Sequence, residues 1–345
     1  MSNGIRNCCD NIMEHKNKDI IISSPIRLAR NAAGLPFPAR LSAERAKKLP
    51  KDVYAAVAQT DRFNLFIMER LGSVEAGILK EKHLVSEDLL RNTVSGAAVI
   101  NDAETVSVMV GEEDHIRIQC ILGGQDFREA YRVADRVDDD ISKKIAYAFD
   151  ARLGYLTACP TNVGTGMRAS AMMFLPGLSI FNSLEACIEA VARLNMTIRG
   201  VYGEGSDSAG YLYQVSNQRS LGVSENELLD AVEMSVGHIE DAELRARELL
   251  LKNGGAEFRD KIQRAYGVLT HAYCLGSAEF MQAVSLVKLG VFYGIIKLTD
   301  PDRLEKLTVE AQPASLQSLS GQELSPETRD IFRAGYVAQV LKSIS

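Results

Sequence analysis

Residues 115–121 place the strongest constraint on the fold of this chain, because apolar and polar side chains alternate there without a break. Ile116 and Ile118 would share one face of a strand, and Arg117 and Gln119 would share the other. Such alternation is typical of a sheet that is buried on one face and polar on the other. We therefore expect a largely antiparallel sheet whose second face can carry charged groups.

Further strands are predicted on both sides of this stretch. Short apolar runs at 97–100 and 106–110 flank the polar residues 101–104, and this pattern favours a hairpin. The other segments with strand character are 19–24, 168–174 and 195–216.

Helices are predicted where apolar residues recur every three or four positions. Residues 125–147 and 182–194 show this spacing. A capping box at Ser224–Glu227 starts a long helix through residue 251, which the following Asn-Gly-Gly sequence ends. The last helix starts at Ser325, with a proline in its first turn.

These elements predict an α+β chain with a mainly antiparallel sheet flanked by helices, followed by a smaller helical domain. We expect a mobile N-terminus over 1–18, a catalytic domain over 19–250 and a helical C-terminal domain over 251–345. Apolar helices after residue 255 make a homodimer through the C-terminal portion a reasonable expectation.

Composition excludes several classes of function. The 345 residues carry 39 basic and 45 acidic side chains, a net charge of -6, and these charges are interspersed. That balance argues against broad nucleic-acid binding, which depends on phosphate neutralisation. No apolar run approaches the ~20 residues of a membrane span, and the polar N-terminus lacks a signal core. The six cysteines form no C-x-x-C pair, so we expect free thiols and the reducing cytoplasm.

Four short segments could carry chemistry, although no Walker loop, kinase glycine loop or H-E-x-x-H motif is present. Each also has a simple structural explanation: a strand end with solvated arginines, an acidic turn, a buried inert cysteine and a hairpin turn. The functional alternative for the acidic cluster is a site for a cationic substrate, with one carboxylate as base. The four segments are 23–31, 111–117, 159–170 and 199–206.

Taken together, these segments resemble the phosphagen (guanidino) kinase family, and most closely its bacterial branch, the protein arginine kinases. The resemblance rests on E-E-D-H-I-R and C-P-T-N-V-G-T-G-M-R, which are long and specific. It also rests on S-S-P-I-R-L-A-R-N, E-K-H-L-V-S at 81–86 and R-G-V-Y-G-E. It covers residues 19–222 and continues more weakly to R-D-I-F-R-A at 329–334.

The resemblance implies ATP-dependent phosphorylation of a guanidinium nitrogen. Phosphoryl transfer needs charge neutralisation and alignment, and arginines can hold a triphosphate in place of a Walker loop. Mg²⁺ would be carried mainly by the phosphates, with no dedicated metal ligands in the protein. By family position, the ATP-binding residues would be Ser23, Ser24, Ile26, Arg27, His83, Arg117, Arg168, Ala169, Ser170, Ala171, Met172, Arg199, Gly200, Val201, Tyr202, Gly203 and Glu204.

The resemblance also implies roles at the acceptor end of the site. Glu113 matches the catalytic glutamate, which would take the proton from a guanidinium that does not deprotonate freely. Glu204 matches the second substrate-binding glutamate, and Cys159 matches the reactive cysteine that would tune the guanidinium's orientation. Two positions depart from the family pattern. Pro25 stands where a phosphate-binding arginine is usual, and Gly111 stands where asparagine is common.

A protein acceptor is favoured over a free guanidino compound. Kinases of small guanidino compounds carry a helical domain of roughly 80–100 residues ahead of the first arginine segment, whereas here that segment starts by residue 23. The alternatives are a kinase of free arginine or another small guanidino compound, and a catalytically impaired phosphoarginine-binding adaptor, which Pro25 suggests.

A second phosphoarginine site is predicted on the last helix. Arg329 and Arg333 lie four residues apart, so they share one helix face, with Asp330 and Ala334 beside them. Protein arginine kinases use this sequence as an allosteric pocket, although a solvated helix face is the simpler explanation. The resemblance further implies a cytoplasmic stress-response role. Proteins would be marked for a Clp-type protease and a heat-shock repressor inactivated, with a zinc-finger protein as activator.

Overall fold

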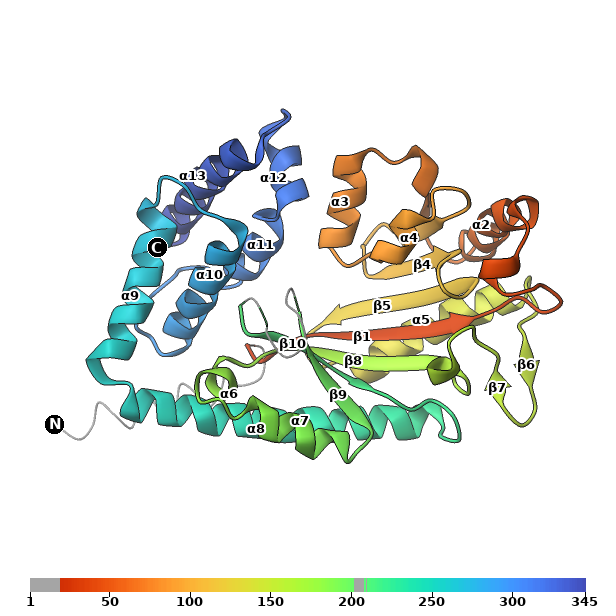
Figure 1. Ribbon diagram of the computed structural model, residues 1–345, viewed down its shortest axis with the longest axis horizontal. Helices are drawn as coiled ribbons and strands as arrows, with labels where there is room; N and C mark the ends of the chain where they lie inside the picture. The colour runs from red at the N-terminus through yellow and green to blue at the C-terminus, as the bar shows by residue number, and fades with distance from the viewer. Residues whose placement is uncertain (1–18, 202–207, 209) are drawn as a thin grey trace.

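The computed structural model describes residues 19–201, 208 and 210–345. The expected mobile N-terminus, 1–18, lies outside the described residues. Figure 1 shows the sheet in the middle of the molecule, the long helix α8 along one side, and helices α9–α13 grouped at one end.

Eight antiparallel strands form the central sheet in the order β2-β3-β4-β5-β1-β8-β10-β9. A separate two-stranded hairpin, β6–β7, follows helix α5. The strands are β1 Ile21–Arg30, β2 Phe63–Ile67, β3 Ala97–Asn101, β4 Val106–Val110, β5 Ile116–Gly123, β6 Phe149–Asp150, β7 Gly154–Tyr155, β8 Met167–Phe174, β9 Met196–Gly200 and β10 Leu212–Asn217.

Helices surround the sheet and make up the whole C-terminal end. They are η1 Pro38–Arg40, α2 Ala43–Val57, η2 Met68–Arg70, α3 Ser73–Glu81, α4 Glu87–Arg91, α5 Phe127–Ser142, η3 Pro160–Asn162, α6 Pro176–Ile180, α7 Leu184–Ala192, α8 Glu225–Asn253, α9 Gly255–His271, α10 Ser277–Phe292, α11 Arg303–Glu310, α12 Pro313–Ser320 and α13 Pro326–Ile344. Within the described residues, no helix is long and apolar enough to span a bilayer.

The two faces of the sheet differ as the alternation over 115–121 predicts. One face carries apolar side chains such as Ile118 and Leu28, which pack with those of α5 and α8 in the largest core. On the other face, α3 and α4 cover β3 and β4 through a small core around Leu84 and Met109. Beyond these two strands, the second face over β5, β1 and β8 carries arginines. The fold thus leaves a charged surface on a rigid sheet.

The C-terminal helices have a core of their own. It is built on α9, α10 and α13, with residues such as Phe280 and Val337 fully buried. The capping box of Ser224 and Glu227 at the start of α8 is present, and Ser325 caps α13. The α+β fold with an antiparallel sheet and a helical C-terminal part is therefore confirmed, whereas the boundary at residue 250 stays a prediction.

Two elements differ in length from their predictions. β1 continues to Arg30 rather than ending at residue 24, because it pairs with β5 as far as Arg30 and with β8 as far as Leu28. Arg27 is therefore a mid-strand residue, not a solvated arginine at a strand end. Helix α5 ends at Ser142, five residues early, since the chain then turns back and Tyr147 pairs with Ala32 after β1. The segment 195–216 contains two strands, β9 and β10.

Candidate active site

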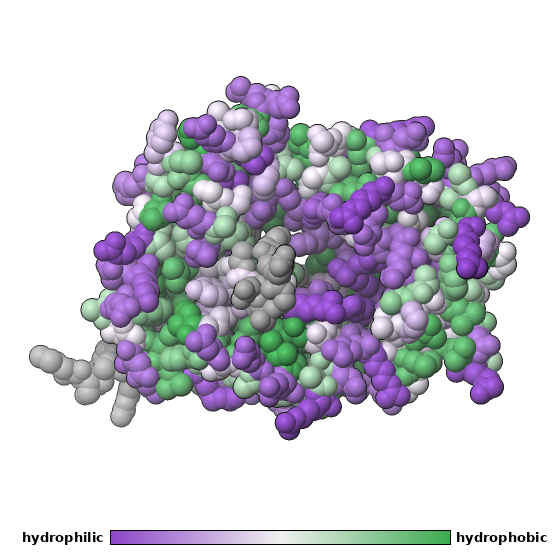
Figure 2. All heavy atoms as spheres, in the orientation of Figure 1, coloured by the Kyte–Doolittle hydropathy of each residue, from purple (hydrophilic) through white to green (hydrophobic). Residues whose placement is uncertain are grey.

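Three arginines project from neighbouring strands onto the same face of the sheet. Arg27 on β1 lies opposite Arg168 on β8, and Ala29 lies opposite Arg117 on β5. These residues line one cavity of about 190 Å³ together with acidic residues of the turn before β5. A second cavity, of about 310 Å³, shares Arg168 and adds Arg199 from β9. Figure 2 shows hydrophilic side chains gathered around the hollow in the middle of this face.

Mutual repulsion marks this arginine cluster as an anion site. Burial, followed by the charges of Arg117 and Arg168, lowers the pKa of Arg27 to about 9, which still leaves it protonated at pH 7. Burial and then Arg199 and Arg117 lower the pKa of Arg168. Repulsion between like charges disfavours the charged form, so a polyanion bound here would offset that repulsion and raise the pKa of both groups. A chain of phosphates has that charge and length.

Polar neighbours hold the arginine side chains in place. The Nε of Arg27 donates to Oε1 of Gln119 at 2.9 Å, and Nη2 of Arg168 donates to Oγ of Ser216 at 2.8 Å. Arg117 forms an ion pair with Glu112 at 2.5 Å. Burial alone raises the pKa of Glu112, but the charge and hydrogen bonds of Arg117 outweigh it and leave that pKa below its ordinary value. Glu112 is therefore a counter-ion and not a base.

Glu113 lies at the acidic end of the same cavity. Partial burial, followed by the charges of Asp114 and Glu112, raises its pKa above the ordinary value. The side chain of Cys159 opposes that rise in the pKa of Glu113. The Sγ of Cys159 also lies 3.0 Å from Oγ1 of Thr161. A carboxylate of raised basicity beside a thiol suits the binding of a cation and the acceptance of its proton.

Two buried residues fix the distance between Glu113 and Cys159. Asn31 donates to Oδ1 of Asp114 at 2.6 Å and accepts from the backbone N–H of His115 at 2.9 Å. Oδ1 of Asp114 in turn accepts from the N–H of Ala158 at 2.7 Å. The turn that carries Glu113 and the loop that carries Cys159 are therefore joined through the residues next to them, Asp114 and Ala158. Sequence reasoning missed these roles, although both residues lie in the quoted motifs.

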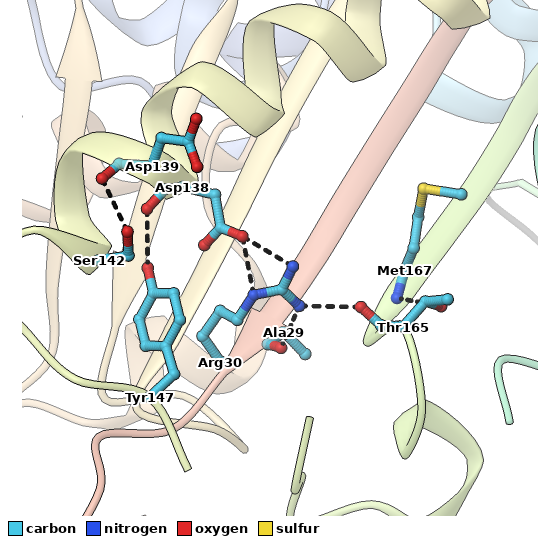
Figure 3. A network of polar contacts seen from close by, with 8 residues as sticks. All are labelled: Ala29, Arg30, Asp138, Asp139, Ser142, Tyr147, Thr165 and Met167. Atoms are coloured by element: carbon cyan, nitrogen blue, oxygen red, sulfur yellow. Dashed lines mark hydrogen bonds and ion pairs between the residues drawn. The ribbon is translucent and has the colours of Figure 1, made fainter. Parts of the chain in front are cut away.

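Arg30 anchors the other end of the cysteine loop (Figure 3). Its Nε and Nη2 form an ion pair with Asp138 at 2.9 and 2.7 Å, and its Nη1 donates to the carbonyl of Thr165 at 2.9 Å. The guanidinium also lies 3.5 Å from the centre of the Tyr155 ring, a cation–π contact. Arg30 is 3% exposed, so it has a structural role and does not bind ligand.

Gly111 begins the acidic turn with φ +82°. Glycine adopts this left-handed conformation without cost, and asparagine tolerates it better than most residues. The departure from the family's asparagine therefore leaves the turn intact. Pro25 lies within β1 and its carbonyl accepts from Oγ of Ser170; it offers no donor to the cavity.

The predicted nucleotide residues separate into two groups. Four of them are fully buried and have no side-chain route to the cavity: Ser24, Ile26, Ala169 and Ala171. Alternation along β1 and β8 turns these four side chains toward the face that α5 and α8 cover, so their place at the nucleotide stays a prediction that only their backbone could fulfil. Ser170 is also buried and bonds to the backbone of β1. Tyr202, Gly203 and Glu204 lie outside the described residues.

The remaining predicted residues lie on the polar face or at its edges. Ser23 and Met172 are paired in β1 and β8. Gly200 ends β9 opposite Tyr213, and the next residue, Val201, donates its N–H to the carbonyl of Leu212 in β10. His83 follows α3 with φ +58°, and its carbonyl accepts from Gln119 at 2.6 Å. The surrounding protein and then the charge of Arg27 lower the pKa of His83.

The predicted second site lies on α13, apart from the residues of both cavities. Arg333 is fully buried, so the interpretation of a solvated helix face is wrong for it. Its Nε donates to the carbonyl of Ala311 at 2.8 Å, and its Nη1 donates to the carbonyl of Leu275 at 2.7 Å and to Asp330. Among the described residues, Nη2 of Arg333 and Nε of Arg329 have no hydrogen-bond partner although both are buried. Ala334 is buried in the helical core.

Comparison with known proteins decides the family. Residues 45–246, well over half of the chain, match the sequence family described as the ATP:guanido phosphotransferase C-terminal catalytic domain. The chain belongs to the ATP:guanido phosphotransferase family. Residues 255–345 of this kinase match the family described as the protein-arginine kinase McsB C-terminal domain.

Curated relatives place this kinase in the protein-arginine kinase branch. It is 43% identical over 330 residues to the protein-arginine kinase of Caldanaerobacter subterraneus subsp. tengcongensis, covering 94% of this chain and 98% of the relative. It is 46% identical to the protein-arginine kinase of Clostridium kluyveri, covering 95% and 96%.

Solved structures support the fold alone. A lombricine kinase aligns with a TM-score of 0.59 at 24% identity, over 68% of each chain. A duplicated taurocyamine kinase from Schistosoma mansoni aligns with a TM-score of 0.60 at 24% identity, over 74% of this chain and 38% of that one.

Proposed function

We propose that this kinase transfers the γ-phosphoryl group of ATP to arginine side chains of proteins. The observation that carries the proposal is a single cavity with a cationic end, formed by Arg27, Arg117 and Arg168, and an acidic end at Glu113. A triphosphate suits the first end and a guanidinium suits the second. The names of its relatives and the match of its C-terminal helices to those of protein-arginine kinases support a protein acceptor.

In the proposed reaction, a terminal nitrogen of the acceptor guanidinium attacks the γ-phosphorus and the bond from that phosphorus to the ADP oxygen breaks. Glu113 takes the proton that the nitrogen loses. Cys159, whose side chain lowers the pKa of Glu113, orients the guanidinium, and Glu204 is proposed to bind its other side. The arginines stabilise the charge on the transferring group and on ADP, the main catalytic requirement of phosphoryl transfer.

Mg²⁺ is proposed to enter with ATP. Among the described residues, no group of three or more His, Cys, Asp or Glu side chains is placed to hold a metal ion. Glu112 is occupied by Arg117. Phosphate oxygens and water would therefore supply its ligands, and the ion would supply charge neutralisation.

A direct assay tests the proposal. The protein is incubated with ATP and either free arginine or an unfolded arginine-rich protein, and acid-labile phosphoarginine is measured in each. Phosphoarginine on the protein substrate is expected. Transfer to free arginine alone would favour the small-guanidino kinase, and ATP binding without transfer would favour the impaired adaptor that Pro25 suggests. Glu113→Gln serves as the inactive control.

Regulation by phosphoarginine is the second part of the proposal. The unpartnered guanidinium nitrogens of Arg329 and Arg333, with Asp330 between them, suit a ligand that carries both a phosphate and a guanidinium. Kinetics with and without added phosphoarginine test this part. If added phosphoarginine leaves the rate of phosphoryl transfer unchanged, Arg329, Asp330 and Arg333 have a purely structural role.

The cellular role follows from the family resemblance. We propose a cytoplasmic enzyme that marks proteins for a Clp-type protease and inactivates a heat-shock repressor, with a zinc-finger protein as activator and a homodimer through the C-terminal part. The described cysteines are free thiols, which agrees with a reducing compartment. Affinity purification of the tagged kinase from heat-stressed cells tests the partners.

A further inference from the structure

Glu81, the last residue of α3, bonds to a helix more than 200 residues later in the sequence. Its Oε1 accepts from the N–H of Ala314 at 2.6 Å, and its Oε2 accepts from the N–H of Ser315 at 2.8 Å and from the Ser315 hydroxyl at 2.7 Å. These N–H groups open α12, whose own N-cap residue, Gln312, makes no side-chain cap bond. Glu81 therefore caps α12 from another part of the chain.

The two helices are packed too closely for this contact to be incidental. Gly77 lies one turn before Glu81 on the same face of α3. A Cβ added to Gly77 would lie 2.6 Å from the Cβ of Ala314, which is closer than real atoms approach. Figure 1 shows α3 and α12 facing each other across the top of the molecule.

The turn after α3 connects Glu81 to the nucleotide end of the cavity. His83 is two residues after Glu81, and its carbonyl accepts from Nε2 of Gln119 at 2.6 Å. The Oε1 of Gln119 accepts from Arg27 at 2.9 Å. The orientation of the Arg27 guanidinium thus depends on the position of the end of α3.

The start of α12 is held from its other side by Arg333. The carbonyl of Ala311, three residues before Ala314, accepts from Nε of Arg333 at 2.8 Å. Residues 311–315 therefore lie between Arg333, on α13, and Glu81, on α3. A shift of either side chain moves the same short segment.

We infer that Glu81 is a positioning residue for phosphoryl transfer. By capping α12 it fixes the His83 turn and, through Gln119, the guanidinium of Arg27, so that the C-terminal helices take part in nucleotide binding. The same segment would carry a change at Arg333 to the nucleotide end; this extension rests on the proposed phosphoarginine pocket.

The test compares two substitutions on neighbouring segments. Glu81→Gln keeps the length of the side chain but removes the charge and one of the two carboxylate acceptors. Charge-assisted hydrogen bonds are roughly twice as strong as neutral ones, so we expect KM for ATP to rise about tenfold. We expect KM for the protein substrate to stay unchanged and kcat at saturating ATP to stay within about twofold. Glu87→Gln is the control, because Glu87 is half exposed and pairs only with Lys80 and Arg91 among the described residues.

Further measurements separate this inference from the proposed function. Calorimetry measures the affinity for ATP whether or not any acceptor is phosphorylated. Hydrogen exchange of the Ala314 and Ser315 amides should be faster in Glu81→Gln than in wild type, while the amides in the core of α13 stay protected. Gly77→Ala separates the helices with Glu81 still present and should weaken ATP binding in the same way. Wild-type ATP affinity in both variants would overturn the inference. If phosphoarginine does not change the rate of the wild-type enzyme but Glu81→Gln binds ATP weakly, the proposed phosphoarginine pocket is rejected and the positioning role of Glu81 is kept.

Discussion

At the scale of single residues, the proposed chemistry depends on the charge of Glu113. Burial and two acidic neighbours raise its pKa, and only the ionised form can accept a proton. We expect kcat/KM to fall as pH drops through this raised pKa, above the range of an ordinary glutamate. Asp114→Asn removes one neighbouring charge but keeps the acceptor oxygen used by Ala158. The acid limb of the pH profile should then move to lower pH; an unmoved limb would contradict the assignment of Glu113 as base.

The same pKa shift links activity to stability. A carboxyl whose pKa is raised on folding stabilises the folded chain while protonated, and that stabilisation is lost as pH rises through the raised pKa. Ionised Glu113 therefore destabilises the fold at pH 7. Glu113→Gln should lower the rate of transfer by about 10²–10⁴-fold and should raise Tm at pH 7 while leaving ATP affinity nearly intact. Thermal unfolding at pH 4 and pH 7 checks the sign, because the gain in Tm should shrink at acid pH.

At the scale of elements, the ion pair of Arg30 and Asp138 joins β1, α5 and the cysteine loop. Removing one partner of a buried pair leaves an uncompensated charge and costs about 3–5 kcal/mol. We expect Asp138→Ala to lower the free energy of unfolding by about that amount, measured by urea denaturation. Asp139→Ala is the matched control. Asp139 is next to Asp138 in the sequence but its side chain is exposed, so this substitution should change the free energy of unfolding little. Equal losses in both variants would mean that the pair contributes no more than a surface charge does.

The elements also show how far the sequence can be interpreted. The hairpin of β3 and β4, the capped start of α8 and the start of α13 were predictable, because each depends on neighbours in sequence. The true length of β1 was not, since its second half is a strand only because β5 and β8 lie beside it. Glu113, Cys159 and the arginines were predicted from long motifs. Asn31, Gln119 and the cap by Glu81 depend on contacts that no local pattern contains.

At the scale of the whole molecule, Arg333 combines an observed structural role with a proposed regulatory one, and a single substitution would remove both. It is fully buried and bonds to Asp330 on α13, to the segment after α11 and to the loop before α10. Arg333→Ala should therefore lose the phosphoarginine response together with stability of the C-terminal helices. Arg329→Ala, at a partly exposed position, should lose the response with a smaller change in Tm. Activation that persists in Arg329→Ala would remove this residue from the proposed pocket.

The place of β1 in the sheet has a consequence for how the chain folds. β1 precedes every other strand in the sequence, yet it joins β5 to β8 and so connects the two halves of the sheet. Until it inserts, each half exposes an unpaired edge, and such edges pair readily with other chains. Pairings across more than 90 residues, such as Arg27 with Gln119, also close slowly. Insertion of β1 therefore competes with self-association during folding. The yield of folded enzyme should rise on dilution or with assistance by chaperones.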